Sequence, residues 1–246
     1  MSGFTCAKYV TTWLSHFLDE SLGLLFGSEC AVCGELISTG AICEACDHLE
    51  PVVPPFCKRC GYCLPAEMKD CGYCRLGNWS DLSQVRSGFW FDERARLLWG
   101  KIKFHRRHEL LRALTPLLQV TPIPLEGVLM SVPLPFSRWM SRGFNQSDWI
   151  ARSAKRAVHS FGLIREGNAD PQSLLNAYER AKNVKGSFSW RLKSSPPEKI
   201  VLIDDIYTTG STLRECARIL KQAGAKEVTG WTLFRTPYRG HRLSFR

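Results

Sequence analysis

An acidic pair followed by a loop of small residues is the part of this sequence that most clearly indicates chemistry. Asp204 and Asp205 follow the apolar run 200–203. The loop comprises Thr208, Thr209, Gly210, Ser211 and Thr212. Its backbone N–H groups would face an anion, its glycine permits close approach, and a following helix adds the positive end of its dipole. The segment predicts a site for a 5′-phosphate, with both carboxylates accepting hydrogen bonds from an attached ribose.

A second candidate anion site lies in residues 132–147, which read VPLPFSRWMSRGFNQS. Arg138 and Arg142 supply planar, permanently charged donors, and Gly143 allows a ligand to approach the backbone. Pyrophosphate matches this set of donors. A basic surface turn is the alternative interpretation.

Alternating strands and helices are expected to position both loops. The apolar run 200–203 is typical of a buried parallel strand, and residues from 213 onward carry apolar side chains at helical spacing. The same reasoning predicts strands over about 87–91, 127–133 and 227–234, and helices through about 102, over 107–118 and over 146–161. This alternation predicts an α/β fold with a mainly parallel sheet and ligands at the carboxyl ends of its strands.

Eight of the eleven cysteines form four CxxC pairs, which predict metal sites. The pairs are Cys30 and Cys33, Cys43 and Cys46, Cys57 and Cys60, and Cys71 and Cys74. Eight thiolates match two tetrahedral Zn²⁺ sites that lack an open position for water, so the zinc is expected to be structural. A disulfide framework is the competing hypothesis, which a reducing compartment would disfavour.

The cysteine-rich segment looks like a tandem duplication. Residues 30–46 and 57–74 both begin with CxxCG and both end with a second CxxC pair. The repeat predicts that each half binds its own ion, with Gly34 and Gly61 allowing the tight turn of a zinc knuckle. Cys63 is an additional thiol that is expected to be free, although it could compete as a ligand.

The chain has a formal net charge of +10, which falls to about +6 once eight thiolates and two Zn²⁺ ions are counted. Basic clusters lie close to aromatic residues in the sequence. They would neutralise the phosphates of a nucleic acid while the rings stack on unpaired bases. A solvated basic face with aromatic residues in the core explains the same pattern equally well. The residues concerned include Lys101, Lys103, Arg106 and Arg107 near Trp99 and Phe104, and Arg138 and Arg142 near Trp139.

The segment DDIYTTGST resembles the phosphoribosyl-pyrophosphate loop of type I phosphoribosyltransferases. Together with the cysteine-rich front end and the segment RGFNQS, it makes the chain similar to the ComF family of competence-associated proteins from roughly residue 28 onward. The resemblance implies a type I phosphoribosyltransferase-like sheet with pyrophosphate bound in the second loop. It is firmest there for Arg142, Gly143, Asn145 and Gln146.

The resemblance also implies a lid and a catalytic pair. Residues 172–188 are similar to the family's segment after a flexible catalytic hood, with Gln172, Arg180 and Lys185 closing over substrate. Upstream, this chain has GNAD where the family tends to carry a threonine and basic residues. If transfer occurs, Mg²⁺ would accompany phosphoribosyl pyrophosphate, and Asp204 and Asp205 would hold the ribose as its ring develops positive charge. Whether the chain is an active transferase stays open.

Three parts are expected: an amphipathic helix over 1–27, a double zinc ribbon over 28–76 and a phosphoribosyltransferase-like domain over 84–246. The chain contains no run of 18 apolar residues, so no transmembrane segment is expected. No basic region precedes the apolar stretch near the N-terminus, which disfavours a signal peptide. A cytoplasmic location is the resulting expectation.

Two hypotheses about function remain. The first is a ComF-type protein that binds a phosphoribosyl ligand and handles single-stranded DNA during natural transformation, with a helicase or the DNA-import machinery as protein partner. The second is a phosphoribosyltransferase that salvages a nucleobase and releases pyrophosphate. The segment Arg235-Thr236-Pro237-Tyr238, just after the strand expected over 227–234, occupies the place where many relatives select a base, but its character does not name one.

Overall fold

The computed structural model describes a large part of the chain. The described residues are 28–38, 42–64, 71–72, 74, 79–104, 108–159, 161–167 and 184–237. The expected helix over 1–27, the lid residues Gln172 and Arg180, and the basic residues Arg106 and Arg107 lie outside these ranges.

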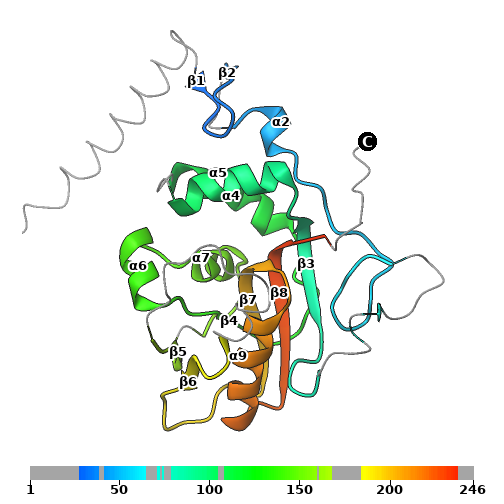
Figure 1. Ribbon diagram of the computed structural model, residues 1–246, viewed down its shortest axis with the longest axis vertical. Helices are drawn as coiled ribbons and strands as arrows, with labels where there is room; N and C mark the ends of the chain where they lie inside the picture. The colour runs from blue at the N-terminus through cyan, green and yellow to red at the C-terminus, as the bar shows by residue number, and fades with distance from the viewer. Residues whose placement is uncertain are drawn as a thin grey trace, which may run out of the picture. The chain divides into compact units, whose positions relative to one another are not determined.

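A four-stranded parallel sheet forms the centre of the fold (Figure 1). Its strands, in spatial order, are β3 (Val85–Trp90), β8 (Glu227–Arg235), β7 (Lys199–Tyr207) and β4 (Val128–Ser131). All three neighbouring pairs run parallel. The four residues 200–203 are completely buried, as expected for a strand with a neighbour on each side and helices on the faces. The expected α/β class with a mainly parallel sheet is confirmed.

The helices follow the strands in alternation. Their bounds are α4 (Glu93–Phe104), α5 (His108–Val120), α6 (Phe136–Arg142), α7 (Gln146–Ser153) and α9 (Ser211–Gln222). Helix α9 buries Leu213, Cys216, Ala217 and Leu220, whose spacing places them on one face. None of the helices in the described part of the chain has the length and hydrophobicity of a bilayer-spanning segment.

Two small antiparallel sheets and one short helix complete the described elements. Strands β1 (Ser28–Glu29) and β2 (Leu36–Ile37) pair with each other. Strands β5 (Leu163–Arg165) and β6 (Phe188–Trp190) form the second pair, and the short helix is α2 (Glu44–Asp47).

The helix expected over 146–161 is shorter in the structure, because it ends at Ser153. Lys155 adopts a positive φ of 51°, which turns the chain out of the helix. The next residues then run beside β4: the Leu129 N–H donates to the Ala157 carbonyl, and the His159 N–H donates to the Leu129 carbonyl. The outer edge of β4 is thus paired, which satisfies backbone groups that a continued helix would have left open.

Two compact units make up the chain. One contains residues 1–48 and 97–114, and the other contains residues 49–96 and 115–246. The first half of the cysteine repeat therefore falls in one unit, whereas the second half falls in the unit that contains the sheet. The domain boundaries expected from the sequence stay a prediction.

Candidate anion site and metal centres

The loop between β7 and α9 has the local geometry of an anion site. Gly210 precedes the first turn of α9 in a left-handed conformation, with φ 74° and ψ 8°. A Cβ atom there would lie 2.5 Å from the Tyr207 hydroxyl, so both conformation and space require glycine. The hydroxyls of Thr209 and Ser211 hydrogen-bond to each other, and Thr208 and Thr209 are exposed. The first amides of α9 follow directly, as in other helix termini that bind anions.

The two aspartates lie inside strand β7, which continues to Tyr207 rather than ending near residue 203. Asp204 Oδ1 accepts hydrogen bonds from the Ser147 hydroxyl at 3.1 Å and from the Asp205 N–H at 2.9 Å. Asp205 Oδ1 accepts from the Ile206 N–H at 2.8 Å. Both side chains are partly exposed. The strand and these donors therefore fix the orientation of both carboxylates just before the loop.

Three arginines share the electrostatic environment of these carboxylates. Burial lowers the pKa of Arg142, the charge of Arg138 lowers it further, and Asp205 acts in the opposite direction. Burial and Arg138 likewise lower the pKa of Arg165, while Asp204 raises it. Positive and negative groups thus gather at one edge of the sheet. Arg165 lies on β5, outside both loop motifs.

Residues 132–147 contain a helix, whereas the sequence indicated only a loop. Helix α6 ends at Gly143, which has a φ of 81° and donates its N–H to the Trp139 carbonyl. Asn145 then begins α7: its Oδ1 accepts from the Ser147 N–H at 3.0 Å, and its Nδ2 donates to the Val132 carbonyl at 3.0 Å. Asn145 therefore holds both ends of this segment in place.

Gln146, the first residue of α7, is buried. It is only 1% exposed, and its Oε1 accepts a hydrogen bond from Arg142 Nη1 at 3.3 Å. Its Nε2 has no hydrogen-bond partner among the described residues. In this structure Gln146 orients Arg142, and the binding roles expected for both residues stay predictions.

The loops after β4 and β7 meet because their strands are parallel neighbours. The register pairs Ser131 with Ile203, so both chains leave the sheet at the same edge. Ligands of α/β proteins bind at such edges, next to the point where the strand order reverses. The structure therefore brings the aspartates together with the arginine-containing segment, as the sequence predicted. The Ser147 contact was not predicted, because it depends on where α7 crosses β7.

Lys185, the described member of the expected lid, lies near the start of α9. It lines a pocket together with Asp81, Leu82, Val184, Ser211, Arg214, Glu215 and Arg218. The neighbouring Gly186 donates its N–H to Glu215 Oε1 at 2.8 Å, and Arg218 donates to both oxygens of Glu215. Glu215 thus anchors the backbone beside Lys185 to helix α9.

Replacing this anchor, by Glu215→Gln, is expected to increase amide hydrogen exchange over 184–187. The hydrogen bonds from Arg218, and then from the Gly186 N–H, lower the pKa of Glu215 below its ordinary value. The stability from this carboxylate is therefore complete above its unfolded-state pKa and is lost as the pH falls through the folded-state pKa. Relative to the intrinsic exchange rate at each pH, the wild-type protein should lose the same protection only in acid.

Glu198→Gln is the matched control, because Glu198 forms an exposed ion pair with Lys226. Such pairs contribute little to stability, so exchange over 184–187 should not change. Equal exchange in Glu215→Gln and wild type at neutral pH would show that the contact does not anchor this segment.

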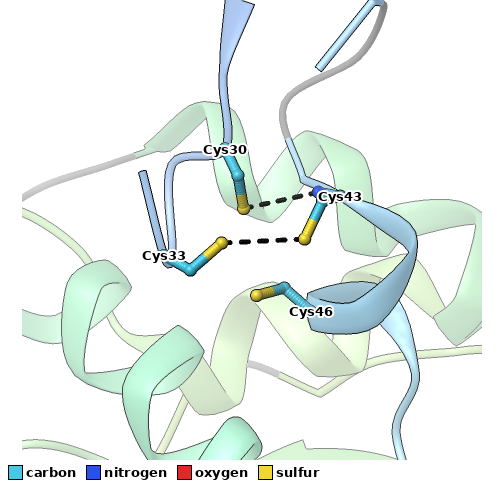
Figure 2. A group of neighbouring side chains, drawn as sticks. All are labelled: Cys30, Cys33, Cys43 and Cys46. Atoms are coloured by element: carbon cyan, nitrogen blue, oxygen red, sulfur yellow. Dashed lines mark hydrogen bonds between the residues drawn. The ribbon is translucent and has the colours of Figure 1, made fainter. Parts of the chain in front are cut away.

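Each half of the cysteine repeat gathers four thiols. Figure 2 shows Cys30, Cys33, Cys43 and Cys46 turned toward a common centre, with the Cys33 and Cys43 sulfurs 3.7 Å apart. In each four-cysteine group, all sulfurs lie within 4.8 Å of one another. Sulfurs placed tetrahedrally at the usual Zn–S distance of about 2.3 Å are about 3.8 Å apart. The first group therefore fits one zinc ion.

The second group has the same geometry. It comprises Cys57, Cys60, Cys71 and Cys74. The Cys60 and Cys71 sulfurs are 3.6 Å apart. Cys63 does not belong to the group, and none of the cysteines in the described part of the chain is disulfide-bonded. The predicted sequential pairing and the two four-cysteine zinc sites are confirmed by this geometry, and the full ligand sets indicate structural metal.

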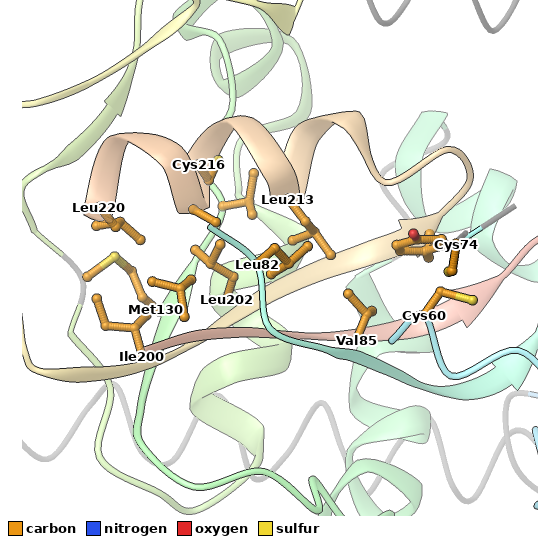
Figure 3. Packing of buried hydrophobic residues seen from close by; sticks show 14 of the residues in the cluster. Cys60, Cys74, Leu82, Val85, Met130, Ile200, Leu202, Leu213, Cys216 and Leu220 are labelled. Carbon is orange, nitrogen blue, oxygen red and sulfur yellow. The ribbon is translucent and has the colours of Figure 1, made fainter. Parts of the chain in front are cut away.

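The second group is part of the hydrophobic core of its unit. Figure 3 shows Cys60 and Cys74 in the same packed layer as Leu82, Val85 and residues of β7 and α9. A Cβ atom on Gly61 would collide with the Val85 carbonyl oxygen, so this knuckle lies directly against strand β3. The zinc site and the sheet are therefore built around one core.

A buried cation joins the second group to the anion loop. Arg235 is fully buried, and its guanidinium donates to the Cys60 carbonyl and lies 3.3 Å from the Cys60 sulfur. It also lies 5.0 Å from the ring centroid of Tyr62 and 4.6 Å from that of Tyr207, the residue before the loop. The sequence places Arg235 in the segment expected to select a base, yet this side chain points into the core. Its position directly after the strand predicted over 227–234 was the available signal.

The aromatic residues near basic clusters divide into two groups. Trp90 and Trp99 are 4% and 1% exposed, which makes them core residues. Phe104 and Trp139 are 71% and 47% exposed. Of the basic residues expected on α4, Lys103 lies 5.9 Å from the ring centroid of Trp99, and Lys101 is partly exposed. Trp90 and Trp99 therefore match the interpretation as core residues, whereas Phe104 and Trp139 have rings exposed to solvent.

Comparison with known families finds two matches. Residues 135–244 match the phosphoribosyl transferase domain, and residues 21–75 match the double zinc ribbon domain. Solved structures overlap weakly. A phosphoribosyltransferase from Corynebacterium diphtheriae is 16% identical, with a TM-score of 0.32 over 55% of this chain and 82% of that chain. An adenine phosphoribosyltransferase from Rhodothermus marinus is 16% identical, with a TM-score of 0.31 over 54% and 81%. The fold assignment therefore rests on the sheet and the domain match.

Three curated relatives match between 42% and 77% of this chain. The DNA utilization protein YhgH of Escherichia coli O157:H7 is 36% identical over 152 residues, 57% of this chain and 66% of the relative. The match thus spans just under two thirds of that protein. Competence protein F of Haemophilus influenzae is 29% identical over 77% of this chain and 84% of the relative. Competence protein ComFC of Streptococcus pneumoniae is 35% identical over 42% and 46%.

Proposed function

We propose that this chain, which is similar to ComF-type competence proteins and matches the phosphoribosyl transferase and double zinc ribbon domains, binds phosphoribosyl pyrophosphate or a related phosphoribosyl ligand. We further propose that it handles single-stranded DNA during natural transformation. The observation that carries the first part is the placement of two oriented carboxylates and Arg142 beside one small-residue loop. The names of the relatives, which refer to DNA utilization and competence, support the second part.

Each part of the ligand has a matching group in the site. The loop hydroxyls and the first amides of α9 would take the 5′-phosphate, and the carboxylates of Asp204 and Asp205 would accept from the ribose hydroxyls. Arg138, Arg142 and Arg165 would neutralise the pyrophosphate. Mg²⁺ bound to pyrophosphate supplies additional neutralisation of the leaving charge. Should transfer take place, the two carboxylates would also favour the positive charge that develops on the ribose ring.

Calorimetric titration of the zinc-loaded protein with phosphoribosyl pyrophosphate and Mg²⁺ tests this proposal. The double variant Asp204→Asn, Asp205→Asn is expected to bind at least on the order of 100-fold more weakly, because two charge-assisted hydrogen bonds are weakened. Asp148→Asn is the matched control, since Asp148 forms a surface ion pair with Arg152 on α7. Absence of binding by the wild-type protein, or equal binding by the double variant, would reject the phosphoribosyl site.

The DNA part of the proposal has a separate test. Affinity for single-stranded oligonucleotides should fall steeply as salt is added, because phosphate contacts release counterions. A cytoplasmic location and a helicase or import protein docked on the zinc ribbon belong to this proposal. Pyrophosphate release that depends on one nucleobase, without affinity for single strands, would favour nucleobase salvage instead.

A further inference from the structure

Helix α6 presents an apolar face to solvent at the edge of the candidate site. Phe136 is 69% exposed, Trp139 47% and Met140 57%, and no residue of the helix is buried. The rings of Phe136 and Trp139 are stacked, with centroids 6.2 Å apart and planes inclined by 18°. We call these three residues the α6 platform. Elsewhere in the described residues, large exposed apolar side chains occur one at a time along the sequence.

The platform is held in place by its backbone. The Pro135 carbonyl accepts from the N–H groups of Arg138 and Trp139, each at 3.0 Å, at the start of the helix. The Gly143 N–H closes its other end on the Trp139 carbonyl at 2.7 Å. The exposed rings therefore belong to a helix whose backbone hydrogen bonds run from Pro135 to Gly143, and none of its residues is buried in the core.

Positive charge lies on the same helix as these rings. Arg138 lies between Phe136 and Trp139 in the sequence and is itself exposed. Its charge acts on both Arg142 and Arg165, which places the three guanidinium groups within electrostatic reach of one another. An apolar protein partner would have to bring acidic groups to this surface. A nucleic acid single strand offers flat bases for the rings and phosphates for the arginines.

We propose that the α6 platform stacks unpaired bases of a nucleic acid single strand, while Arg138 and its neighbours neutralise the phosphates. This inference rests on the proposed handling of single-stranded DNA, and it gives that activity a place on the molecule. The basic residues of α4 are a poorer candidate, because the Trp99 ring beside Lys103 is 1% exposed and Phe104 is the single exposed ring of that helix.

Two oligonucleotides of equal length test the proposal: oligothymidylate and an abasic strand with the same phosphates. Stacking strengthens binding by roughly 5- to 150-fold per base. Fluorescence anisotropy at fixed low salt should therefore show the wild-type protein binding oligothymidylate at least about fivefold more tightly. Trp139→Ala, alone and with Phe136→Ala, should remove this preference and leave affinity for the abasic strand unchanged. Trp139→Phe should retain most of it.

Two further variants separate stacking from charge. Phe161→Ala removes a ring that is 74% exposed on another segment, and it should change neither affinity. Arg138→Gln should weaken binding of both strands and reduce the salt slope by about one. This pattern distinguishes a base-stacking surface from a general loss of affinity.

The outcomes also separate this inference from the proposed function. If the wild-type protein binds both strands equally, or if Trp139→Ala keeps the preference for bases, the inference is wrong although the protein handles single strands. If neither strand binds, both the inference and the proposed DNA activity fail, whereas the phosphoribosyl titration stands by itself. A change from dimer to monomer in Trp139→Ala without any effect on DNA would identify the face as a contact between two copies of this chain.

Discussion

Cys60→Ser is expected to lower the melting temperature of the sheet-containing unit by roughly 10 °C or more, whereas Cys33→Ser is expected to leave that transition unchanged. Both variants lose one thiolate of a four-cysteine zinc site, and a structural site contributes its binding energy to folding. Cys60 is buried in the same core as Leu82 and Val85 (Figure 3). Cys33 is exposed and belongs to the other unit. A loss of about 4 kcal/mol produces a shift of this size.

Scanning calorimetry of the two variants, combined with zinc analysis, checks this result. Each variant should contain about one zinc ion per chain instead of two. The difference between their melting temperatures then reports which site lost its ion. Cys63→Ser is a further control, because Cys63 lies outside both groups. Equal shifts in Cys60→Ser and Cys33→Ser would contradict the idea that only the second group is built into the core of the sheet.

Arg235→Met is expected to destabilise the same unit by about 3–5 kcal/mol, as is usual when one partner of a buried charged contact is removed. The substitution leaves the Cys60 carbonyl without its donor and removes the cation between the rings of Tyr62 and Tyr207. Tyr207 is packed so closely against Gly210 that no Cβ fits between them. A displaced Tyr207 ring should therefore disturb the anion loop as well, and weaken phosphoribosyl pyrophosphate binding about tenfold or more.

The control for this prediction is Arg156→Met. Arg156 donates to the carbonyls of Ile123, Leu125 and Gly127, before the amino end of β4 and hence away from the loop edge. It should lower stability, measured by urea unfolding, without changing the affinity of the folded protein for the ligand. Unchanged affinity in Arg235→Met, measured by calorimetry well below its melting temperature, would show that the cation acts on stability alone.

Much of the sheet could be predicted from the sequence because its strands are buried on both faces. A continuous apolar run at 200–203 marks β7, and the strand predicted over 227–234, whose apolar residues are interrupted by threonine and glycine, corresponds to β8. The extension of β7 through Asp204 and Asp205 was missed, since acidic residues are unusual in a strand. Helix α6 was missed for a different reason: its seven residues, between Pro135 and Gly143, are too few to show a helical period in the sequence.

The candidate site was predictable to the extent that it is local in the sequence. The acidic pair, the small-residue loop and the segment with Arg142 each carry their own pattern. Contacts across the fold carry none: Ser147 reaches Asp204 over 57 residues, and Arg235 reaches Cys60 over 175. Gly34 and Gly61 occupy equivalent places in the repeat and both have positive φ. Only Gly61 lies against another strand, which the repeat pattern could not indicate.

Strand β8 lies between β3 and β7, although it comes after both of them in the chain. A ribosome therefore completes β3, β4 and β7 before the strand that holds β3 to the rest of the sheet has been made. Until then β3 has an open edge on the side where Gly230 and Trp231 will later pair with Val85 and Arg86. The second knuckle also lacks its cation, because Arg235 closes this same strand. Assembly of sheet and zinc site is thus expected to be a late event in synthesis, in which a chain that stalls before residue 227 exposes an unpaired strand prone to aggregation.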